Sequence, residues 1–136
     1  MRHVTRGDVN MKRSYFFWIA TILALAFGLL TFLAPGFAAT QFQLAASPAT
    51  DTTFRILGSV LLGVAVLNFL VRNQPMSETL KAVLWGDVSI HGIGLVGDIW
   101  SAAAGNIPWA GIAVGVVAHL IVLIGALYYL SRPNAA

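Results

Sequence analysis

The sequence predicts an all-α membrane protein, a bundle of four transmembrane helices with both termini in the cytoplasm. Of its 136 residues, 58% are hydrophobic and only 10% are charged, whereas about 25% of the residues of an average soluble domain are charged. Four apolar segments, each close to the roughly 20 residues that cross a bilayer as a helix, occupy almost the whole length. No room is left for a separate soluble domain.

The first membrane helix is expected at residues 14–33, after a polar and basic cytoplasmic tail at residues 1–13. Aromatic residues at its start are typical of a membrane interface, and Pro35-Gly36 ends it. A cleaved signal peptide is the alternative, because a basic start precedes the apolar run and small residues follow it. The apolar run is longer than the roughly 7–15 residues of such peptides.

The loop at residues 36–52 contains no Lys or Arg, and its apolar residues favour a short interfacial helix or cap. The second membrane helix is expected at residues 52–71, where Gly58 and Gly63 supply small residues for close helix contact.

The third membrane helix is expected at residues 78–103, with Ser77 as its N-cap. A tight turn at residues 104–108 leads to the fourth at residues 109–130. Residues 131–136 are predicted to form a short cytoplasmic tail.

The basic residues predict how the helices are oriented. Seven of the eight Lys and Arg residues lie near the N-terminus, near the connection between helices two and three, or near the C-terminus. The positive-inside rule then places both termini in the cytoplasm, and we expect a multi-pass protein of the cell inner membrane. Because the basic residues gather at membrane-facing segments, the net charge of +3 indicates the lipid bilayer as partner and not nucleic acid.

Three ionisable side chains share one face of the third apolar segment. With Asp87 at zero and about 100° per helical residue, His91 falls near 40° and Asp98 near 20°. Insertion of an Asp at a helix centre costs about 2.5–3.5 kcal/mol. Such residues usually face a bundle interior or a watery cavity, so this face is the candidate ligand or proton site.

Counting depth at about 1.5 Å per residue suggests partners on the other helices. His119 of the fourth segment is level with His91, and Arg55 of the second segment is level with Asp98, which predicts a histidine pair and an outer ion pair. Asp87 has no basic residue at its depth. It is expected to be protonated, hydrogen-bonded to Asn68 or His91, or solvated from the cytoplasm.

Haem binding and proton relay fit these residues, whereas a metal site is only partly supported. His91 and His119 could hold a haem b between two helices, with glycines leaving room for the porphyrin. Asp87 and His91 have the i, i+4 spacing of a metal-ligand pair, but the sequence does not supply a complete ligand set, so no metal site is predicted. Acid and histidine chains in membranes also relay protons, which favours a proton-coupled small-molecule transporter that uses Asp87.

The stretch from Phe54 to Arg72 resembles one in small, mostly uncharacterised bacterial four-helix membrane proteins of the DoxX-like type. In both, an Arg opens the second helix, glycines follow, and a polar residue, here Asn68, precedes a closing Arg. The resemblance covers the four-helix layout and about twenty residues, and it implies an inner-membrane helical bundle. That group has a loose association with quinol oxidation.

Our first functional interpretation is an accessory or small-ligand-binding membrane protein with a polar, ionisable interior site. A haem- or quinone-linked redox component and a proton-coupled transporter are the alternatives. Enzyme activity is disfavoured, because the chain has no cysteine and no nucleophile elbow or phosphate loop, so no catalytic residue is predicted. The glycine-rich helices also allow homo-oligomers, and an accessory role implies assembly into a larger membrane complex.

Overall fold

The computed structural model describes residues 6–132, with side chains from Arg13 onward. Within that range the secondary structure is helical, in five elements: α1 (Arg6–Leu33), α2 (Pro35–Gln41), α3 (Pro48–Val71), α4 (Glu78–Ala103) and α5 (Trp109–Ser131). All but the short α2 are long and apolar enough to cross a membrane. The predicted fold class, an all-α bundle of four membrane-spanning helices, is confirmed.

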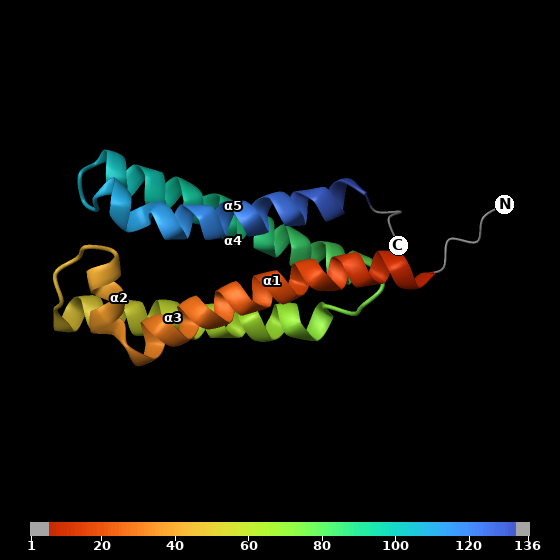
Figure 1. Ribbon diagram of the computed structural model, residues 1–136, viewed down its shortest axis with the longest axis horizontal. Helices are drawn as coiled ribbons and strands as arrows, with labels where there is room; N and C mark the ends of the chain where they lie inside the picture. Colours follow the sequence, from red (N-terminus) through yellow and green to blue (C-terminus); the bar gives the residue numbers. More distant parts are fainter. Residues whose placement is uncertain (1–5, 133–136) are drawn as a thin grey trace.

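The start of α1 and the end of α5 lie at the same end of the bundle (Figure 1). We call this the terminal end and the opposite one, where α2 lies, the α2 end. The assignment of the terminal end to the cytoplasm stays a prediction.

Two helices begin earlier than the sequence predicted. α1 starts at Arg6, so residues 6–13 of the expected tail are helical, whereas residues 1–5 and 133–136 lie outside the described range. α3 starts at Pro48, because Ser47 caps it by accepting a hydrogen bond from the Thr50 main-chain N–H at 3.1 Å. A serine N-cap followed by proline is a strong start signal that the prediction overlooked.

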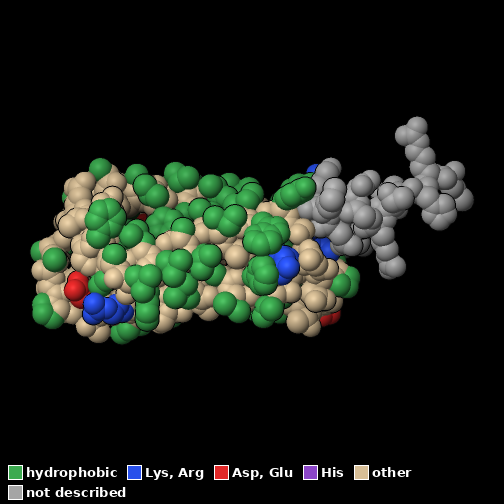
Figure 2. Space-filling model, turned by 60° about the horizontal axis from the view of Figure 1, so that its bottom comes forward, with side chains coloured by type: hydrophobic (Ala, Val, Ile, Leu, Met, Phe, Trp, Pro, Cys, Tyr) green, Lys and Arg blue, Asp and Glu red, His purple; other side chains and the backbone are tan. Residues whose placement is uncertain are grey.

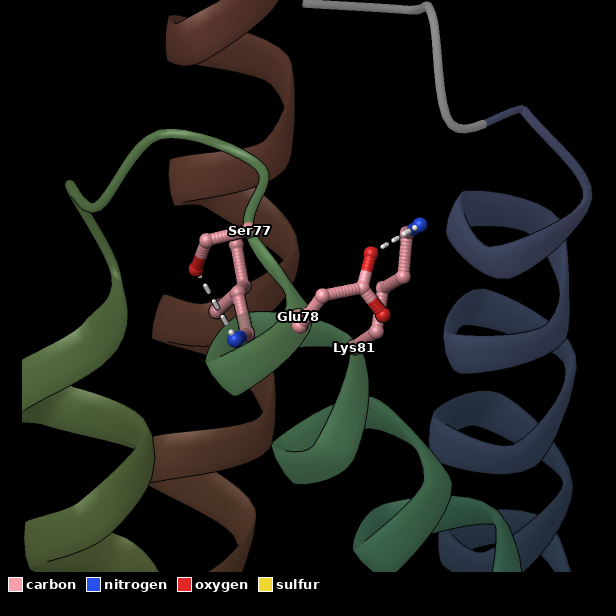
Figure 3. A network of polar contacts seen from close by, with 4 residues as sticks. Ser77, Glu78 and Lys81 are labelled. Carbon is pink, nitrogen blue, oxygen red and sulfur yellow. Dashed lines mark hydrogen bonds and ion pairs between the residues drawn. The ribbon is translucent and has the colours of Figure 1, made fainter.

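The start of α4 shows the expected cap (Figure 3). Ser77 Oγ accepts a hydrogen bond from the Leu80 main-chain N–H at 3.2 Å. Lys81 Nζ donates to Glu78 Oε1 at 2.7 Å, one turn along the exposed side of the helix. At the other end of α4, Gly105 adopts a positive φ of 77° that turns the chain toward α5.

The bundle consists of two helical hairpins. α1 packs along α3, and α4 packs along α5, whereas contacts between the hairpins are fewer. α1 and α3 approach most closely at Gly58, where an added Cβ atom would lie 2.7 Å from the Phe32 main-chain nitrogen and 2.8 Å from the Gly28 oxygen. Gly63 has nothing within 4 Å of such an atom, so only the first of the two predicted contact glycines serves that role.

The hairpins are held together mainly near the terminal end. Aromatic and alanine side chains of α1 pack there with leucines of α4 and small residues of α5. Gly125 of α5 admits the Phe16 ring, because a Cβ atom at that glycine would collide with the edge of this ring. The buried Arg13 adds a polar contact by donating to the Gln74 main-chain oxygen at 2.8 Å.

Short helix α2 covers the opposite end of the first hairpin, as the apolar loop residues predicted. Ala38 and Ala39 are fully buried against Phe54 of α3, and the ring of Phe42 lies 5.5 Å from that of Phe54. Hydrophobic side chains are spread along the whole face shown in Figure 2, and the Lys and Arg side chains in view lie toward its two ends. This distribution is the one expected of a protein surrounded by lipid.

The Gly58 contact gives a direct test of the α1–α3 packing. Substitution of Gly58 by Ala is expected to lower the free energy of unfolding by about 1–3 kcal/mol, because the added methyl group pushes against the α1 backbone. Gly63→Ala is the matched control and is expected to be neutral or slightly stabilising. Thermal unfolding in detergent measures both, and equal melting temperatures for the two variants would refute the close contact.

Candidate functional site

The two membrane histidines contact each other directly. Nδ1 of His91 on α4 lies 2.9 Å from Nδ1 of His119 on α5, a hydrogen-bond distance, and the ring centroids are 5.1 Å apart. Both side chains are partly buried. The pair expected from equal depth is therefore formed.

Gly94 makes this contact possible. A Cβ atom at Gly94 would lie 2.6 Å from Cε1 and 2.8 Å from Nε2 of His119, so any larger residue would collide with the imidazole. On the helical wheel of α4, Gly94 falls within about 20° of Asp87. The glycine thus belongs to the polar face, and the histidine of α5 rests in the space that it leaves.

Asp98 extends the histidine pair toward the α2 end. Its Oδ2 lies 3.8 Å from Nε2 of His119, an ion-pair distance but too long for a hydrogen bond. Gly115 of α5 faces the same oxygen, since a Cβ atom there would lie 3.1 Å from it. Oδ2 is shielded from solvent and has no hydrogen-bond partner among the described residues.

The order of contacts restricts how protons are distributed. If Asp98 is ionised, its carboxylate favours a proton on Nε2 of His119. A neutral His119 then accepts at Nδ1, and His91 must donate from its own Nδ1. Protonation of Asp98 permits the opposite arrangement, so the carboxyl group and both imidazoles form one coupled chain, which we call the Asp98–His119–His91 chain.

Asp87 belongs to a separate polar contact between the hairpins. Asn68 Nδ2 of α3 donates to Asp87 Oδ1 at 3.3 Å, and both side chains are buried, with 1% and 3% exposure. Asn68 was one of the partners expected for Asp87, and this choice is confirmed. Asp87 Oδ2 and Asn68 Oδ1 have no hydrogen-bond partner among the described residues.

The predicted ion pair between Arg55 and Asp98 is wrong. Among the described residues, no ion pair involves Arg55, whose side chain is exposed near the α2 end, and Asp98 faces His119 instead. The two residues lie at similar depth but on different hairpins, α3 against α1 and α4 against α5. Equal depth was therefore not sufficient to place them together.

The histidine pair does not fit a haem in this arrangement. Metal–imidazole bonds are about 2 Å long, so nitrogens on opposite sides of an iron stand about 4 Å apart, with the porphyrin between them. The two Nδ1 atoms are closer, at 2.9 Å, and the His119 ring fills the space beside Gly94. Side chains of residues 13–132 also form no cluster of three or more His, Cys, Asp or Glu suited to a metal ion.

Comparison with protein-family models, with curated proteins and with solved structures finds no match to this chain. The interior polar residues must therefore be interpreted from their own geometry.

The role of Gly94 provides a test of the site. Gly94→Ala is expected to displace His119 and break its hydrogen bond with His91, because the methyl group would occupy the imidazole's place. Gly97→Ala is the control, since nothing lies within 4 Å of a Cβ atom there. Nuclear magnetic resonance of ¹⁵N-labelled histidine measures the Nδ1 signals, and unchanged signals in Gly94→Ala would contradict the arrangement.

Proposed function

We propose that the protein binds a small ligand in its polar interior, with the Asp98–His119–His91 chain as the ionisable wall of the site. The observation that carries this proposal is the 2.9 Å contact between His91 and His119 inside an apolar bundle, continued by Asp98 at 3.8 Å. Ionisable groups are costly in this environment, and the usual reason for their presence is function.

A purely structural role explains these residues less well. α4 and α5 are joined by a short turn at residues 104–108 and pack along one another, so they need no ionisable clamp to stay adjacent. A buried acceptor on Asp98 without a hydrogen-bond partner also lowers stability instead of raising it. A ligand that donates a hydrogen bond to this group would remove that cost.

The test uses purified protein in detergent and four classes of small membrane-permeant compound: amines, alcohols, carboxylic acids and quinones. At least one class is expected to raise the melting temperature and to shift the imidazole signals of His91 and His119. His3, which lies outside the described residues, serves as an internal reference. The control replaces both membrane histidines by Gln. If the ligand raises the melting temperature of this variant as much as that of the wild type, the proposal is rejected.

Proton-coupled transport is the second candidate, favoured by the position of Asp87. This acid lies one helical turn from His91 on the same face of α4, toward the terminal end, and its hydrogen bond goes to Asn68. Its Oδ2 is buried and has no hydrogen-bond partner among the described residues. A line of exchangeable groups along a membrane helix is typical of proton relays.

Transport is tested in liposomes that contain a pH-sensitive dye. In wild-type liposomes, a gradient of a permeant amine or alcohol is expected to drive proton movement. In Asp87→Asn liposomes, most of this proton movement is expected to be lost. Asp51→Asn replaces an acid in the first turn of α3 and should retain the signal. Equal proton movement in wild-type and Asp87→Asn liposomes would remove this candidate.

Membership of the DoxX-like group, a place in the inner membrane, an accessory role in a larger complex and homo-oligomers remain proposals from the sequence. A quinone-linked redox role is likewise a proposal, and quinones are included in the compound panel for that reason. Large side chains of α4 are exposed, among them Trp85, Ile93 and Trp100. They would face either lipid or another subunit of a homo-oligomer or larger complex.

A further inference from the structure

A cavity of about 250 Å³ lies between the two hairpins toward the α2 end. Its walls come from α1 at Ala26, Phe27 and Leu30, from the end of α2 at Gln41 and Phe42, and from α5 between Ala110 and Gly115. Several of these side chains, including that of Val114 at 68% exposure, also reach the outer surface. The cavity is therefore accessible from the lipid side of the bundle.

The polar groups around this cavity include a main-chain hydrogen-bond acceptor and a side-chain amide that can accept or donate. The Phe42 main-chain oxygen points at α5, since a Cβ atom on Gly111 would lie 2.7 Å from it, and Gln41 contributes a side-chain amide. Asp98 does not line the cavity and its Oδ2 is buried, but it lies directly behind Gly115, a lining residue with no side chain of its own to separate the two. The lining residues include no Lys, Arg or His.

The aromatic walls favour the same kind of ligand. Phe27 and Phe42 are among the lining residues, and an ammonium group is attracted to the face of an aromatic ring, most strongly where water is excluded. Apart from Gln41, the remaining lining residues are aliphatic or glycine. Drug-sized ligands occupy roughly 300–1,000 Å³, so this cavity suits a smaller molecule with an apolar body.

We infer that this cavity binds a compact lipophilic amine, with the ammonium group oriented toward Phe42 O and Asp98 and the apolar body against Phe27 and Leu30. The inference rests on the proposed function and names both the place and the chemical class of its ligand. The amine reaches the cavity from the bilayer, and its charge couples it to the Asp98–His119–His91 chain.

The test compares three probes of nearly equal shape: 2-phenylethylamine, 2-phenylethanol and 3-phenylpropanoate. Equilibrium dialysis against the protein in nanodiscs, corrected with empty nanodiscs, measures binding. The amine is expected to bind at least about tenfold more tightly than the alcohol or the acid. Equal affinity for the alcohol or the acid, or binding of none of the three, would overturn the inference.

Two substitutions locate the site. Val114→Phe fills the cavity and is expected to reduce amine affinity by about tenfold or more. Val117→Phe is the control, because Val117 lies on the same helix with 56% exposure and does not line the cavity. Asp98→Asn is expected to lower the affinity for the amine and to leave the affinity for the alcohol unchanged. Circular dichroism and melting temperature confirm that each variant is folded.

The outcomes separate this inference from the proposed function. Amine binding that survives Val114→Phe but is lost in His119→Gln would refute the cavity and retain a ligand site at the histidine chain. Amine binding that survives both substitutions would refute the cavity and the histidine chain together. A further outcome is that amine binding is lost in Val114→Phe and fully kept in both His119→Gln and Asp98→Asn. That result would show an amine site in the cavity without coupling to the Asp98–His119–His91 chain, and it would overturn the inference.

Discussion

The hydrogen bond between His91 and His119 is the interaction on which the interior of the second hairpin depends. In water an exposed imidazole pair would contribute little, but within an apolar bundle each unpaired nitrogen carries the cost of lost hydration. The contact is satisfied only because Gly94 leaves space for one ring. The absence of a side chain at Gly94 therefore lets the imidazole of His119 lie directly against α4.

Two regularities made much of this fold predictable. Segment length and apolar content identify membrane helices, because a bilayer offers no alternative partner for the backbone. The constant rise of a helix converts residue number into depth, which correctly paired His91 with His119 and brought Asn68 near Asp87. Both regularities hold for any straight membrane helix, whichever helices pack beside it.

The features that were missed depend on rotation and neighbourhood. Arg55 and Asp98 share a depth, but helix order around the bundle places them on different hairpins. The contact of Gly94 with His119 was not predicted, although Gly94 lies on the polar face of the helical wheel, which was a signal of it. The cavity combines residues of α1, α2 and α5, and only the three-dimensional packing brings such distant segments together.

The division into two hairpins has a consequence for biogenesis. A chain is synthesised from its N-terminus, so α1 and α3 enter the bilayer before α4 and α5. His91, His119 and Asp98 contact one another within the later hairpin and need nothing from the earlier one. Asp87 alone requires Asn68 of α3, a partner already in place when this acid arrives. The buried acid thus meets an amide partner that entered the bilayer before it.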